Sequence, residues 1–98
     1  MLRQTAIELL KEHEPEFRDA GIGALYLFGS VASDRARPTS DVDIFVDVAR
    51  PDGFTLLSLV TLKERMEAIL GASVDLMTRK GMHPRRRPRV EASSIQVF

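Results

Sequence analysis

Two aspartates, Asp41 and Asp43, stand one residue apart in a stretch where apolar and polar side chains alternate. Side chains two apart on a β-strand project from the same face of the sheet, so both carboxylates are expected on one face. Two like charges this close repel, which raises a pKa or requires a cation between them. Magnesium meets that need, because it binds one or two carboxylates together with phosphate oxygens. The pair predicts a magnesium site, although an Asp-x-Asp alone is common by chance.

A possible phosphate cradle precedes this pair at Phe28-Gly29-Ser30, where an apolar run ends in two small residues. Glycine lets backbone N–H groups approach an anion closely, and the start of a helix adds its positive dipole end. The Ser30 hydroxyl can donate to a phosphate oxygen. Gly29 and Ser30 are therefore predicted to bind phosphate near Asp41 and Asp43.

A third carboxylate, Asp75, lies inside the otherwise apolar segment Val74-Asp75-Leu76-Met77. An acid is costly to bury unless it binds something. If this segment is a strand beside the one that carries Asp41 and Asp43, three carboxylates converge. Two metal ions about 3.5–4 Å apart could then clamp the attacking and leaving oxygens of an in-line displacement.

Hydrophobic periodicity predicts the elements that must position these groups. An amphipathic helix opens the chain, with a break at Pro15 near His13 because proline is tolerated only in a first turn. Three strands and one long helix follow, with the helix ending at a glycine; the strands are expected at 24–28, 40–48 and 74–77, and the helix at 55–70. After Lys80 the proline- and arginine-rich composition predicts an extended or irregular tail, with a returning edge strand at 95–98.

These elements predict an α+β fold in a single domain over residues 1–98. Helices alternate with strands, but one strand carries carboxylates on its open face. The economical packing is a small mixed sheet of about three strands, backed by helices on one side. The other side is then the expected working face.

Composition narrows the class of protein. The hydrophobic share of 44% and the charged share of 29% are those of an ordinary globular protein. The absence of cysteine excludes a disulfide framework and a thiolate metal site. No apolar run approaches the roughly 20 residues that a membrane span needs, so a cytoplasmic protein with no membrane partner is expected.

The net charge of zero conceals a strongly basic segment at residues 79–89, which contains no acid. It holds six of the 14 basic residues, namely Arg79, Lys80, Arg85, Arg86, Arg87 and Arg89. Such a segment could be a solvated patch, a surface that docks a partner protein, or a nucleic-acid contact. Nucleic acid is the least favoured of the three, because the chain has one tyrosine and no tryptophan to stack bases.

The spacing Gly29-Ser30, ten intervening residues, then Asp41-Val42-Asp43 resembles the signature of the minimal nucleotidyltransferases, within the DNA polymerase beta superfamily. The likeness extends to Val74-Asp75-Leu76 and to the tail His83-Pro84-Arg85-Arg86-Arg87-Pro88-Arg89. The tail is similar to that of the antitoxin-type members, which are paired with HEPN-domain toxins.

The resemblance implies the nucleotidyltransferase fold and roles for five residues. Gly29 and Ser30 would bind the triphosphate of ATP, Asp41 and Asp43 would bind two magnesium ions, and Asp75 would be the third metal-binding and catalytic carboxylate. The expected reaction moves a nucleoside monophosphate, AMP from ATP, onto an acceptor hydroxyl. In the antitoxin branch the acceptor would be a tyrosine of the HEPN partner.

One departure from the family pattern supports a competing hypothesis. Many members continue Gly-Ser-x-Ala with Arg-Gly, whereas this chain has Ser33-Asp34, and Arg35 or Arg37 on the same loop could substitute for the missing arginine. A non-catalytic module that neutralises its partner by contact, through Arg85–Arg89, would tolerate that loss. Retention of all three aspartates favours the enzyme.

Overall fold

The computed structural model describes all 98 residues as five helices and four strands, which confirms the α+β class. In chain order the elements are α1 (Arg3–Glu12), α2 (Glu14–Asp19), β1 (Ile22–Phe28), α3 (Gly29–Ala32), β2 (Val42–Val48), α4 (Leu56–Leu70), β3 (Val74–Thr78), α5 (Arg87–Ser93) and β4 (Ile95–Gln96). The three predicted strands and the predicted edge strand are all present, and α3 is the short helix that follows Phe28.

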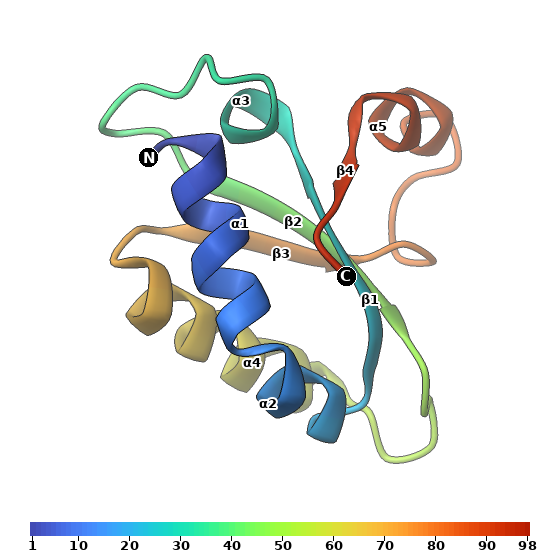
Figure 1. Ribbon diagram of the computed structural model, residues 1–98. Coiled ribbons are helices and arrows are strands. Elements are labelled where there is room, and N and C mark those ends of the chain that lie inside the picture. The colour runs from blue at the N-terminus through green and yellow to red at the C-terminus, as the bar shows by residue number, and fades with distance from the viewer.

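The four strands form one mixed sheet in the order β3-β2-β1-β4 (Figure 1). β1 pairs antiparallel with both β2 and β4, whereas β2 and β3 are parallel. A parallel pair needs a crossover connection, and α4 supplies it between β2 and β3. As a result, β2 and β3 both begin at the end of the sheet where β1 finishes and α3 starts.

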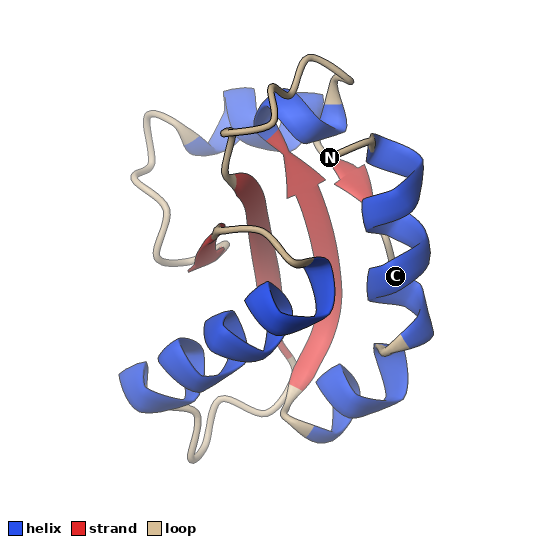
Figure 2. Cartoon of the chain, turned by 90° about the vertical axis from the view of Figure 1, so that its left-hand side faces the viewer, coloured by secondary structure: helices blue, strands red, loops and turns tan.

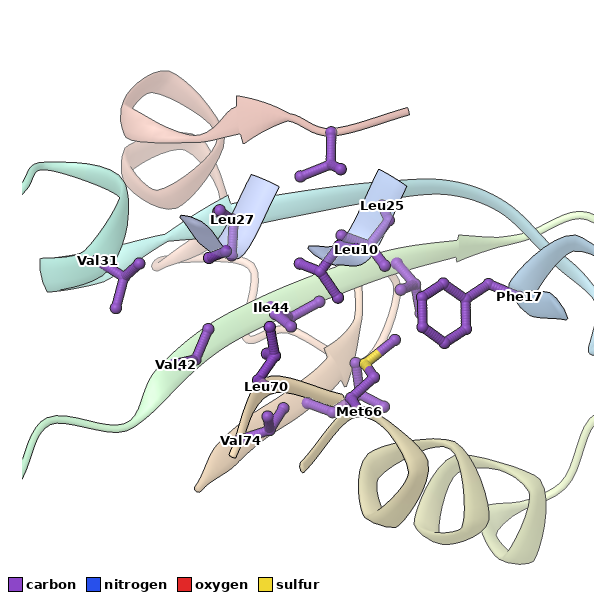
Figure 3. Close-up of a cluster of buried hydrophobic side chains, with 14 of the residues drawn as sticks. Leu10, Phe17, Leu25, Leu27, Val31, Val42, Ile44, Met66, Leu70 and Val74 are labelled. Carbon is purple, nitrogen blue, oxygen red and sulfur yellow. The ribbon is translucent and has the colours of Figure 1, made fainter. Parts of the chain in front are cut away.

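The main core lies between one face of this sheet and the helices α1, α2 and α4. Viewed from the side of α4, the long helix crosses in front of the strands (Figure 2). Val42, Ile44 and Val46 of β2 are fully buried on this face, as the alternation in the sequence predicts. They pack with side chains from the covering helices, among them Leu10, Phe17, Met66 and Leu70 (Figure 3).

Local signals in the sequence set the helix ends as expected. The opening helix breaks at His13, and Pro15 occupies the first turn of α2. Thr55 and Ser58 form a reciprocal capping box at the start of α4, and Gly71 ends that helix in the left-handed conformation at φ 64°. α4 is the longest helix at 15 residues. None of the helices has the combination of length and apolar character needed to cross a membrane.

The opposite face of the sheet differs from the expectation of an open working face. Phe28 and Phe45 are buried there against Met82 and Val90, the latter on α5. Tyr26 stacks on Phe45 with ring centroids 4.6 Å apart. This part of the face is apolar and aromatic, so it gains free energy when the late segment covers it. Only the end of the face near Asp43 is left for chemistry.

The predicted extended tail is also wrong, because Arg87–Ser93 forms α5. Pro88 is compatible with this helix because it lies in the first turn. Arg79, at the end of β3, anchors the segment: it donates to both carboxylate oxygens of Asp47 at 2.8 and 3.1 Å and pairs with Glu91 of α5. Its guanidinium also lies over the ring of Tyr26. These contacts hold α5 against the sheet.

Candidate active site

The predicted phosphate cradle and the predicted metal site touch at Gly29. Phe28, the last residue of β1, is paired with Asp43 of β2. Gly29 follows with φ 71°, in the left-handed region that favours glycine. A Cβ added at Gly29 would lie 2.1 Å from Oδ2 of Asp43. The carboxylate therefore occupies the space that any other side chain would fill, so both the backbone angle and Asp43 require glycine here.

The parallel pairing of β2 and β3 brings the other carboxylates to the same place. Asp43 is the direct partner of Asp75 in the β2–β3 register. Asp41 lies one residue before β2 and is exposed, as is Asp75, whereas Asp43 is half-buried. Burial raises the pKa of Asp43, and the negative charges of Asp75 and Asp41 raise it further. The three acids thus share one electrostatic environment at one end of the sheet.

These carboxylates fit magnesium as a donor set, although they do not form a finished cage. No group of three or more acidic or histidine side chains is positioned to hold a metal ion by itself. Magnesium does not need such a cage, because it is usually bound through one or two carboxylates plus the phosphates of a substrate. A divalent cation would relieve the repulsion of Asp43 by Asp75 and Asp41.

The turn after Gly29 shows what replaces the family's Arg-Gly. The Ser33 hydroxyl donates to the carbonyls of Gly29 and Ser30, both at 3.2 Å, and so caps the end of α3. Asp34 has φ 58°, so it occupies a left-handed position that glycine would suit. Its carboxylate accepts the backbone N–H of Arg3 at 3.1 Å and pairs with the Arg3 guanidinium at 3.2 Å. The replacements thus link this turn to the start of α1.

Other polar and aromatic residues near the site have structural partners. Phe45 is fully buried and packs in the aromatic cluster. Asp47 points to the same side as Asp43 but is bound by Arg79, so it is an ion-pair partner and not a free carboxylate. In the basic segment, Arg87 donates to the backbone carbonyls of Lys80 and Met82 at 3.3 and 3.5 Å.

Sequence reasoning missed the position of Arg86, which it treated only as part of a basic patch. The Arg86 guanidinium lowers the pKa of Asp43, against the larger effects of burial and of the neighbouring acids. No local signal in the sequence could have placed it there, because its position depends on how α5 packs on the far side of the sheet.

Comparisons of the sequence and of the structure with known proteins identify the same family. A family model described as a nucleotidyltransferase domain matches residues 7–97. The protein adenylyltransferase MntA of Thermococcus cleftensis is 37% identical over 84 residues, which are 84% of this chain and 83% of the relative. A solved structure provisionally described as a minimal nucleotidyltransferase is 33% identical and superimposes with a TM-score of 0.81, covering 97% of this chain and 95% of its own.

A more distant structure shares the fold. It is the complex of a tri-AMPylated Shewanella oneidensis HEPN toxin with an MNT antitoxin, and it superimposes with a TM-score of 0.70 at 20% identity. The match covers 99% of this chain and 72% of that one. At this level of identity the likeness establishes a common fold.

Proposed function

Because this chain belongs to the nucleotidyltransferase domain family, we propose that it is a magnesium-dependent protein adenylyltransferase. The proposed reaction transfers AMP from ATP to a tyrosine hydroxyl of a HEPN-domain toxin, and the modification silences the toxin. The proposal assigns Gly29 and Ser30 to the triphosphate, and Asp41, Asp43 and Asp75 to the metal ions and the acceptor. Such a reaction would take place in the cytoplasm, where ATP is available.

The observation that carries the proposal is the contact between Gly29 and Asp43. A phosphate site and a magnesium site must adjoin, because magnesium binds the phosphate oxygens. In this structure the backbone of Gly29 lies so close to the Asp43 carboxylate that a Cβ would be 2.1 Å from Oδ2. Asp75 is next to Asp43 across the β2–β3 pair. Two adjacent acids and a left-handed glycine thus meet at one end of the sheet.

The chemistry requires one bond to form and one to break. The acceptor oxygen bonds to the α-phosphorus of ATP, the bond from that phosphorus to the β-bridging oxygen breaks, and pyrophosphate leaves. Asp75 is exposed beside Asp43, so its carboxylate is open to the acceptor hydroxyl and can accept its proton. The Ser33 hydroxyl binds the carbonyl oxygens of Gly29 and Ser30, not the Ser30 hydroxyl. The Ser30 hydroxyl is therefore free to donate to a phosphate oxygen.

Magnesium, when bound, would neutralise charge on the transferring phosphate and align the attacking and leaving oxygens. Asp41 and Asp43 would hold it from the loop before β2 and from β2 itself. Gly29 keeps the cradle narrow, because no side chain separates its backbone from Asp43.

The proposed donor and acceptor rest on the relatives. The Thermococcus cleftensis protein is named a protein adenylyltransferase, and the Shewanella oneidensis complex contains an AMP-modified HEPN toxin bound to an MNT antitoxin. The first likeness extends over most of both chains at 37% identity, which supports a shared reaction.

The test is to incubate the protein with magnesium and ATP labelled in either the α- or the γ-phosphate, together with a HEPN-domain protein as the proposed partner. The proposal predicts that α-label becomes covalently attached to the partner and γ-label does not, since the γ-phosphate leaves in pyrophosphate. Changing the modified tyrosine of the partner to phenylalanine should abolish the labelling. Attachment of γ-label would identify a kinase and contradict the proposal.

A further inference from the structure

The site lacks a cation at position 33, where the family pattern has an arginine. Ser33 stands in place of the usual arginine, and its hydroxyl is occupied by the carbonyls of Gly29 and Ser30. The nearby Arg3 is paired with Asp34. The triphosphate of ATP carries several negative charges and would approach three aspartates, so a protein cation beside the cradle would favour its binding.

Arg86 lies at the correct end of the molecule to supply that cation. It is the residue that precedes α5, and its carbonyl accepts the N–H of Val90 at 3.0 Å, one turn further on. Val90 is buried against Phe28, the residue directly before Gly29. α5 also packs against α3 and β1, and Figure 1 shows α3 and α5 at the same end of the sheet. The packing of one apolar side chain thus fixes Arg86 near the cradle.

Two other arginines of the basic segment are already bound by other groups. Arg87 is half-buried and donates to the carbonyls of Lys80 and Met82. Arg79 is bound between two carboxylates. The Arg86 side chain is exposed and takes part in none of the chain's ion pairs. It also lies close enough to Asp43 for its charge to act on that carboxylate.

We propose that Arg86 binds the triphosphate of ATP and replaces the arginine that is missing from position 33. The inference rests on the proposed function, because it assumes that ATP binds at Gly29 and Ser30. A guanidinium presents a planar fork of N–H donors that matches two phosphate oxygens, and it stays charged at every physiological pH.

The test compares the full-length protein with Arg86→Gln, and uses Arg85→Gln and Arg89→Gln as matched controls. All three arginines are exposed and lie in one short segment, so loss of general positive charge is equal in each. Calorimetric titration with magnesium–ATP and with magnesium–tripolyphosphate measures binding. Arg86→Gln should lower the affinity for both ligands by about 10- to 100-fold, which corresponds to the loss of one hydrogen bond to a charged group. The controls should change by less than about threefold, and Arg86→Lys should recover part of the loss.

Three results would overturn the inference. Arg86→Gln could bind both ligands as tightly as the wild type, or no more weakly than the two control variants. It could lose affinity for ATP but not for tripolyphosphate, which would place Arg86 at the base or ribose. If the wild type binds neither ligand, the proposed function fails as well, and that outcome is distinguishable because it precedes any comparison of variants.

Discussion

Adding one methyl group at Gly29 tests the geometry of the proposed site. In Gly29→Ala the new Cβ would meet Oδ2 of Asp43 at 2.1 Å, so the carboxylate must move until the two atoms are at least 3.0 Å apart. A non-glycine residue in the left-handed region costs about 1–2 kcal/mol. Forcing the Asp43 side chain from its rotamer adds about 0.5–1.5 kcal/mol. The free energy of unfolding should therefore fall by about 1.5–3.5 kcal/mol.

Gly71→Ala is the matched control. Gly71 also has a left-handed backbone, at φ 64°, but a Cβ there would meet nothing within 4 Å. It should cost only the backbone term of about 1–2 kcal/mol. Placing Gly29→Ala in an Asp43→Ala background should reduce its cost to that of Gly71→Ala, because the clashing oxygen is gone. Thermal unfolding of the four variants measures these differences, at about 4–8 °C of melting temperature per kcal/mol in a domain of this size.

The rate of AMP transfer is a second measure of the effect of Gly29→Ala. A displacement of about 1 Å at a catalytic group can cost about 100-fold in rate. AMP transfer by Gly29→Ala should fall by about that factor at a temperature where the variant is still folded, while Gly71→Ala should transfer normally. If Gly29→Ala costs no more stability than Gly71→Ala and keeps full activity, then Asp43 does not lie against Gly29 as described.

Three further predictions address separate parts of the molecule. Asp43→Asn should stabilise the metal-free protein at pH 7, because burial and the neighbouring acids raise the pKa of Asp43 above 3.8, so that its ionised form opposes folding. Thermal unfolding measures this gain in stability. The gain should shrink as the pH falls through the raised pKa, because the wild-type carboxyl is then protonated. Ser30→Ala should weaken magnesium–ATP binding by about 1.5–3 kcal/mol in calorimetry, and an unchanged affinity would exclude Ser30 from the cradle. Arg79→Ala should lower the free energy of unfolding by about 1–3 kcal/mol, a range reduced for partial exposure of Asp47 and Glu91, and an unchanged value would show that these ion pairs do not hold α5.

The parts of the fold that could be predicted from the sequence are those encoded by local patterns. The apolar stripe and the terminal glycine predict a helix at 55–70, and the structure has α4 at Leu56–Leu70. Proline rules predict the break near His13, where α1 gives way to α2. Period-two alternation predicts which side chains of β2 enter the core, and those residues are buried. In each case the determining interactions lie within a few residues along the chain.

The remaining features depend on contacts between distant segments. α5 has a single buried residue, Val90, so no apolar periodicity reveals it. Its packing partners Phe28 and Phe45 lie on β1 and β2, far away in sequence. The pairing of Asp43 with Asp75 likewise requires β2 and β3 to be neighbours, and the sequence does not determine which strands are neighbours. The proposed role of Arg86 depends on the packing of α5 and on the β2–β3 pairing, so it could not be predicted from the sequence.

The central claim is that this end of the sheet catalyses transfer and does not merely bind a partner. The most direct test is the double variant Asp41→Asn with Asp43→Asn, mixed with α-labelled ATP, magnesium and the HEPN-domain partner. Label transfer and co-purification are measured separately. We predict that the wild type transfers label, and that the variant folds and co-purifies with the partner but transfers none, since neutral amides hold magnesium poorly. A wild type that silences its partner without transferring label would contradict the account and establish a non-catalytic binding module.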